Sequence, residues 1–222
     1  VEYESAFKSP GTFVGQALYR LGIIHYQQGD SDKAVRFLSE LSRGNAVNVD
    51  SKKREIADIH LGLLYVQLKN FKDARVLLTK IWGAETHSFR PEAGYHLAGI
   101  ISKDKNSLLE AAKIFGEVSE RFPKHQLAVD ARLQQGIILN TSGKYEEAQK
   151  SFEKFTVAYP DHKEIDKVNY QLGISLMEQQ HWDKALGHLG EVPQKSSWRD
   201  EALYQSAWCE KRKGDKLAAT KH

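Results

Sequence analysis

The residues of this chain that could do chemistry are nine histidines, a single cysteine and scattered acidic pairs. Zinc sites use spaced histidines and cysteines, but no His-Glu-x-x-His pattern occurs, and Cys209 alone cannot build a cysteine-type site. His60 and His96 fall at equivalent places on two predicted helices, and we favour a packing or solvated role for them over a metal. We therefore predict neither a metal nor a cofactor, and we interpret Cys209 as a small buried hydrophobe.

Catalytic patterns are also missing from the sequence. Gly143-Lys144 lacks the upstream glycine of a phosphate-binding loop and is interpreted as a turn. Glu146-Glu147 favours the positive end of a helix dipole rather than acid-base work, and no Ser-His-Asp order or nucleophile elbow occurs. We expect no catalytic residue and no enzyme. The alternative is a substrate-presenting or regulatory repeat domain of a larger enzyme.

Composition limits the classes of partner. The 222 residues are 41% hydrophobic and 27% charged, and 32 basic against 29 acidic side chains leave a net charge of +3. The short basic clusters at 52–54 and 211–213 are typical of solvated helix faces, so we expect no nucleic-acid partner. No run of about eighteen apolar residues could cross a bilayer. We predict no membrane span, and a lipid anchor outside the chain stays open.

A repeated unit organises the chain. The segments Ile114–Pro123 (IFGEVSERFP) and Ser151–Pro160 (SFEKFTVAYP) are close copies whose prolines lie 37 residues apart. A pair ending in a small residue recurs at similar intervals, at Leu21-Gly22, Leu61-Gly62, Leu97-Ala98, Gln135-Gly136, Leu172-Gly173 and Ser206-Ala207. Six such units fit in the chain.

Each unit reads as two antiparallel helices. About a dozen residues after each small residue stands an alanine, at positions 34, 74, 111, 148, 185 and 219, and small residues on facing helices allow a close approach. Large apolar residues follow the alanine at helical spacing: Leu38 and Leu41, Leu78 and Ile81, Phe115 and Val118, Phe152 and Phe155, Leu189 and Val192. Glycine-containing turns are predicted between the helices at 28–30, 142–144 and 213–215.

These motifs resemble the tetratricopeptide repeat (TPR), as in LGLLY at Leu61–Tyr65 and GKYEEAQKSF at Gly143–Phe152. Gln135 departs from the usual leucine, and an extra residue precedes Ala111. The resemblance implies an all-α fold, a right-handed superhelical solenoid of antiparallel helical hairpins. Residues 15–222 would form six TPR-like units, the last incomplete, and residues 1–14 would be a linker or the tail of a preceding helix, so that the chain would be a fragment of a longer solenoid.

The aromatic-Pro endings and the long repeat spacing resemble bacterial envelope members of the family. These are the lipoprotein of the outer-membrane assembly machine and the periplasmic repeat protein associated with the Tol-Pal system. This narrower resemblance implies a periplasmic or outer-membrane-associated protein, with the cytoplasm as the alternative compartment. It also implies a scaffold for an assembly of proteins.

The first helices of TPR units line a concave groove, which gives the candidate binding residues. The matching positions are Tyr19, Ile23, Tyr26, Ile59, Leu63, Tyr95, Leu133, Ile137, Tyr170, Ile174, Tyr204 and Trp208. Such an apolar, aromatic row with polar tips suits a protein or peptide segment. The alternative is that the tyrosines only pack one first helix against the next. Apolar surface around Leu203 and Leu217 predicts self-association at the C-terminal end.

Overall fold

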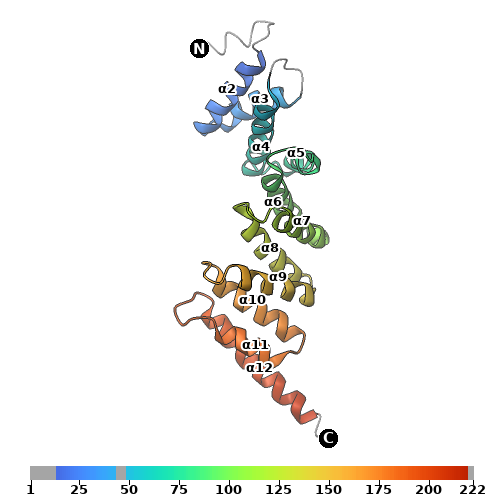
Figure 1. Cartoon of the computed structure of the whole chain (residues 1–222), viewed down its shortest axis with the longest axis vertical. Helices are drawn as coiled ribbons and strands as arrows, with labels where there is room; N and C mark the ends of the chain where they lie inside the picture. Colours follow the sequence, from blue (N-terminus) through green and yellow to red (C-terminus); the bar gives the residue numbers. More distant parts are fainter. Residues whose placement is uncertain (1–13, 44–48, 220–222) are drawn as a thin grey trace. The chain divides into compact units, whose positions relative to one another are not determined.

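The computed structural model describes residues 14–43 and 49–219, without the side chains of residues 215–219. Within these ranges the chain is helical and contains no strand. The elements are α2 (Val14–Gln27), α3 (Ser31–Ser42), α4 (Ser51–Gln67), α5 (Phe71–Gly83), α6 (Arg90–Ile101), the 3₁₀ turn η1 (Lys105–Ser107), α7 (Leu108–Arg121), α8 (Leu127–Thr141), α9 (Tyr145–Ala158), α10 (Ile165–Glu178), α11 (Trp182–Gly190) and α12 (Arg199–Ala219) (Figure 1). The all-α class predicted from the sequence is confirmed.

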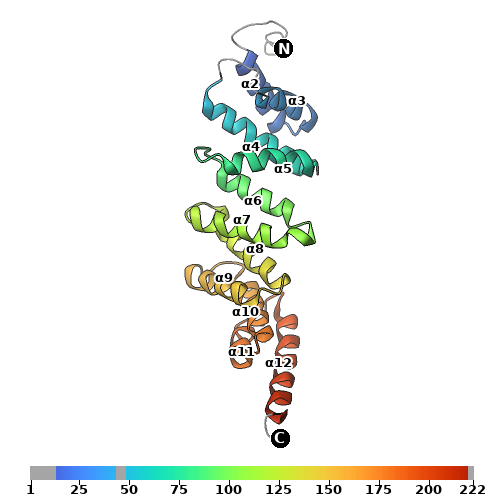
Figure 2. The same cartoon turned by 90° about the vertical axis from the view of Figure 1, so that its right-hand side faces the viewer.

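The helices form two compact units, residues 1–100 and 101–222. In the first unit α2 and α3 pack as one hairpin and α4 and α5 as the next, and α4 contacts both helices of the preceding hairpin. In the second unit each helix from α7 to α12 packs on the next, while α10 also contacts α8 and α12. Figure 2 shows the same succession from the side. Within each unit, neighbouring hairpins therefore pack against one another, as in repeat proteins.

The core of every described hairpin is the stripe predicted on the second helices. All ten of its large residues are buried, from Leu38 to Val192, and so are the alanines at 34, 74, 111, 148 and 185. Ala219 and Leu217 lie outside the described side chains, and residues 1–13 of the predicted N-terminal tail lie outside the described structure.

The predicted glycines do lie at close helix contacts. A Cβ built on Gly62 would come 2.8 Å from Leu78 Cδ2, and one on Gly136 would come 2.5 Å from Phe152 Cε1. Gly22 and Gly173 face Leu38 and Leu189 in the same way. The partner of each glycine is thus the large residue four positions after the alanine. Because glycine has no side chain, the large side chain of the facing helix fills the space beside it.

At the contact between α7 and α8 the glycine is on the second helix of one hairpin, α7, and the large residue is on the first helix of the next, α8. Gln135 stands where a leucine is usual, and its Nε2 lies 2.3 Å from where a Cβ on Gly116 of α7 would be. The hydroxyl of Ser151 on α9 donates to Gln135 Oε1 at 3.2 Å. A glycine on one side and a hydrogen-bond donor on the other therefore accommodate the larger polar residue.

The turns between the two helices of a hairpin need a left-handed residue. Gly29 and Gly143 supply it with φ values of 76° and 71°, as predicted. Lys69 and Gln180 hold the equivalent position with φ values of 58° and 61°, at the steric cost that a side chain has there. The turn predicted at 213–215 is wrong, because α12 continues through Gly214 to Ala219. A glycine inside a helix costs only about 1 kcal/mol, and α12 has no second helix packed back on it among the described residues.

The linkers between hairpins are of two kinds. In one, an arginine in the first turn of a first helix reaches back to a carbonyl at or just after the end of the preceding second helix. Arg54 Nη1 donates to Leu41 O at 3.3 Å, Arg90 Nε to Trp82 O at 3.1 Å, and Arg199 Nη1 to Val192 O at 2.7 Å. These three arginines share one repeat position, eight residues before the small residue, and each ties the start of a first helix to the linker before it.

The other kind of linker follows the aromatic-Pro endings. Phe122 and Tyr159 cap α7 and α9, and each backbone N–H donates to the carbonyl four residues earlier, on Val118 and Phe155. The following histidine then accepts a backbone hydrogen bond two residues on, for example His162 Nδ1 from Glu164 N at 3.2 Å. Two repeats that looked alike in sequence therefore end in the same geometry.

Candidate functional site

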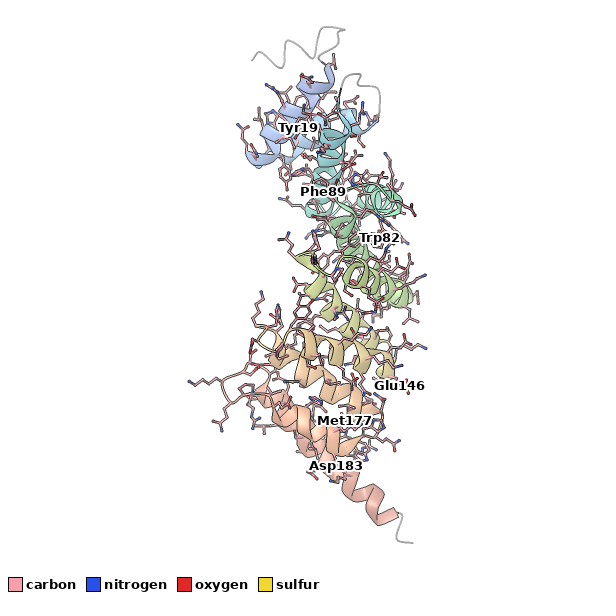
Figure 3. All side chains as sticks on the ribbon, in the orientation of Figure 1. Tyr19, Trp82, Phe89, Glu146, Met177 and Asp183 are labelled. Carbon is pink, nitrogen blue, oxygen red and sulfur yellow. The ribbon has the colours of Figure 1, made fainter. Side chains whose placement is uncertain are left out.

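The candidate groove residues divide into core, half-buried and exposed positions. Ile59 and Leu133 are 3% exposed and belong to the core, so their assignment to a groove is wrong. Eight of the predicted residues are half-buried, namely Tyr19, Ile23, Tyr26, Leu63, Tyr95, Ile137, Tyr170 and Ile174. Tyr204 and Trp208 are exposed by 68% and 39%. Figure 3 marks Tyr19 on α2.

In the first unit two tyrosines of the row pack on histidines, one across two first helices and one within α6. The ring of Tyr26 on α2 meets the ring of His60 on α4 edge to face, with centroids 4.4 Å apart. His60 Nδ1 also lies 2.6 Å from Ile56 O. Tyr95 packs edge to face on His96, and burial holds the pKa of His96 below its usual value. His60 and His96 therefore both pack on tyrosines, and no cluster of three or more metal-binding side chains occurs among the described residues.

In the second unit the row leads to an aromatic stack. Tyr170 of α10 stacks on Trp198, with ring centroids 5.2 Å apart and planes 27° from parallel. Trp198 comes from the loop before α12, and both rings pack on the buried cluster of Leu189, Val192 and Ala202. Burial raises the pKa of Tyr170, the Glu201 carboxylate adds to this, and a hydrogen bond with Gln205 opposes it. Lys167 Nζ lies 5.7 Å from the centre of the Trp198 ring.

Trp208 carries two cations over its ring. Arg212 Cζ lies 4.8 Å and Lys211 Nζ 5.6 Å from the ring centroid, and both side chains are exposed. Tyr204 is one helical turn before Trp208 on the same helix, so the two aromatic side chains are neighbours on the surface. We call Tyr170, Trp198, Tyr204 and Trp208 the C-terminal aromatic surface. It offers apolar rings, a phenol hydroxyl and nearby positive charges.

Sequence reasoning missed Trp198, because it lies in a linker rather than on a first helix. Its only signal was an aromatic residue beside the linker arginine Arg199.

The prediction that Cys209 is buried is confirmed. The thiol is free and buried, its Sγ lies 3.5 Å from Trp182 O, and burial raises its pKa. A buried thiol with a raised pKa is a poor nucleophile.

A separate cleft of about 490 Å³ lies between α7 and α9, above α8. Ala112, Gly116 and Leu139 line it, and Leu109 at its edge is half exposed. Leu139 is two residues from Ile137, a rotation of about 200° around α8, so the cleft lies on the side of α8 opposite the groove position. It lacks exposed aromatic residues and carries charges of both signs, Lys113, Glu117, Glu120, Lys144 and Glu147.

Two family models match the sequence. The model for the outer membrane lipoprotein YfiO matches residues 91–217, and a tetratricopeptide repeat model matches residues 16–43. Neither model describes a catalytic family. No described helix is long and apolar enough to span a membrane.

Solved TPR structures share the fold at low sequence identity. YrrB, described as a TPR protein with an unusual peptide-binding site, is 19% identical, covers 93% of this chain and 98% of its own, and superposes with a TM-score of 0.69. MamA AMB-1 is 20% identical over 80% of this chain and 89% of its own, with a TM-score of 0.63. MamA from Desulfovibrio magneticus RS-1 is 16% identical, with coverages of 80% and 92% and a TM-score of 0.60. No curated protein matches the sequence.

Proposed function

The chain belongs to the YfiO family of outer membrane lipoproteins and is built from tetratricopeptide repeats, and from this premise we propose that it is a scaffold that binds a protein or peptide segment. The family description supports a place in a bacterial envelope assembly, in the periplasm or at the outer membrane. The observation that carries the binding role is the exposure of Tyr204 and Trp208 on α12, the helix whose Gln205 is hydrogen-bonded to Tyr170 of the Tyr170–Trp198 stack.

The chemistry of the surface suggests what its partner presents. Trp and Tyr most often dominate the binding energy of an interface, because a large rigid area is buried at little entropy cost. Lys211 and Arg212 lie over the Trp208 ring, so a segment that lays an apolar side chain on the ring brings its own backbone near two cations. An extended or helical segment with an apolar anchor followed by a carboxylate fits this arrangement.

Truncation of Trp208 tests the proposal. A partner is recovered by cross-linking to the full 222-residue chain, and its dissociation constant is then measured calorimetrically for wild type and Trp208→Ala. We expect at least a tenfold weaker complex, about 1.4 kcal/mol, with little change in melting temperature, because the ring is partly exposed.

The control is Val157→Ala, which removes an exposed apolar side chain from α9, outside the aromatic surface. It should change neither quantity. If Trp208→Ala instead lowered the melting temperature and left the affinity unchanged, Trp208 would be a packing residue and the aromatic surface would not be the binding site.

A further inference from the structure

One face of α12 is covered by no other described part of the chain. Ala202 and Cys209 are buried against the rest of the second unit, and Lys213 on the same side pairs with Asp183 of α11. On the opposite side Asp200, Leu203, Tyr204, Ala207 and Lys211 are all exposed, and we call these five residues the α12 outer face. They fall within an arc of about 100° of one another, since successive residues turn by 100°. Figures 1 and 2 show the last turns of α12 extending beyond α11.

The order of residue types along this face is self-complementary. An acidic residue, Asp200, stands at its beginning, an apolar middle follows, and a basic residue, Lys211, stands at its end. The neighbouring edge repeats this order with Glu201 and Arg212. On the other edge Arg199, which also donates to Val192 O, precedes Glu210. Reversing a copy of such a helix brings unlike charges together at both ends.

We propose that α12 packs against α12 of a second copy of this chain, antiparallel and about a two-fold axis. With the axis level with residues 205 and 206, Asp200 lies opposite Lys211 of the other copy. Tyr204 lies opposite Ala207, a small residue that leaves room for the ring. Such a two-fold axis places each edge of α12 against the same edge of the other copy, so Glu201 also lies close to Arg212 of the other copy. Such an interface is isologous, with the same patch used on both sides.

The alternative parallel arrangement is disfavoured by the same charges. It would place Asp200 against Asp200 and Lys211 against Lys211, and like charges in contact are repulsive. A contact of three helical turns is smaller than a standard interface of about 1,600 Å². The dimer is therefore expected to be weak, to form in the micromolar range and to weaken with added salt.

Sedimentation equilibrium of the 222-residue chain, from low to high micromolar concentration, tests this inference. Wild type should show a reversible monomer–dimer equilibrium. Asp200→Lys or Lys211→Glu alone should weaken dimerisation about tenfold, because each creates two repulsive contacts in a symmetric dimer. The double variant, Asp200→Lys with Lys211→Glu, exchanges the charges and should return the dimerisation constant to within about threefold of wild type.

Glu146→Lys on α9 is the control, since it makes the same kind of charge reversal at an exposed position outside the α12 outer face (Figure 3). It should leave the equilibrium unchanged. A strictly monomeric wild type would overturn the proposal. So would a double variant as weak as the single ones, because the antiparallel register requires rescue. Either result would leave the proposed peptide binding untouched, because the dissociation constant of the partner complex is measured separately.

Discussion

Helices α10 and α12 carry the same repeat positions, 34 residues apart, but differ in what covers them. On one side they agree: Ser175 of α10 and the equivalent Cys209 of α12 are both fully buried. On the other side they differ. Leu176 is 1% exposed, while the equivalent Glu210 is exposed, and Gly173 lies against Leu189 while Ala207 is open.

The cause is the number of packed neighbours. α10 contacts α8 and α9 on one side and α11 and α12 on the other, whereas the described part of the chain places only α10 and α11 against α12. Burial at a repeat position is therefore set by the neighbouring hairpin more than by the residue type. The same comparison explains why Tyr170 is half-buried under Trp198 while Tyr204 is exposed.

Truncation of the apolar side of α10 should have the largest effect on this comparison. Leu176→Ala should lower the free energy of unfolding by about 2–5 kcal/mol, because it leaves a cavity in a fully packed region. Glu210→Ala, at the equivalent position of α12, should change it by less than about 0.5 kcal/mol. Urea unfolding of both variants, followed by circular dichroism at low protein concentration, checks this. Equal losses would show that α12 is covered after all.

Overpacking the small residue should have the next largest effect. Gly173→Leu adds a side chain where the built Cβ already lies 2.6 Å from Leu189 Cγ, and we expect a loss of about 1–3 kcal/mol. Ala207→Leu places the same side chain on an open face and should be nearly neutral. Thermal unfolding of the pair is the measurement. A Gly173→Leu protein that melts at the wild-type temperature would contradict the close contact between α10 and α11 at Gly173.

Removal of the tyrosines should have the smallest effect. Tyr170→Ala loses the stack on Trp198, and aromatic pairs contribute about 0.5–1.5 kcal/mol beyond burial, so a loss of about 1–2 kcal/mol is expected. Tyr204→Ala should cost less than about 0.5 kcal/mol in the monomer. Tyr170→Phe separates the two parts of the first effect, because it keeps the stack and removes only the hydrogen bond with Gln205. If Tyr204→Ala were the more destabilising change, Tyr204 would be a core residue rather than a surface one.

The TPR pattern was readable because it depends on local spacing. Gly62, Gly136 and Gly173 were predicted at close contacts, and they lie there. The apolar stripe follows from helical periodicity alone, so Phe152 and Phe155 were found correctly as core residues. The turn at Gly143 was found because a left-handed residue has a compositional signal.

The candidate site was less predictable, because the repeat register gives the position of a residue within its unit but not the solvent exposure of its side chain. Ile59 and Leu133 share their register with Tyr170 and Tyr204, but they are buried. Trp198 lies in a linker and holds none of the repeat positions used to predict the groove. Its stack on Tyr170 depends on how the loop before α12 folds back. The linker arginines at 54, 90 and 199 do share a register, and a search of each repeat position for charged residues would have found them.

The sequence by itself therefore determined the repeat, the helices, the residues of the core stripe and the family, because these depend on spacing within about forty residues. Only the tertiary structure decided that Gln135 fits against Gly116, that Trp198 stacks on Tyr170, and that no described residue covers one face of α12. Each of these depends on the side chains of a neighbouring helix or loop, and the local pattern of one helix holds no information about what packs against it.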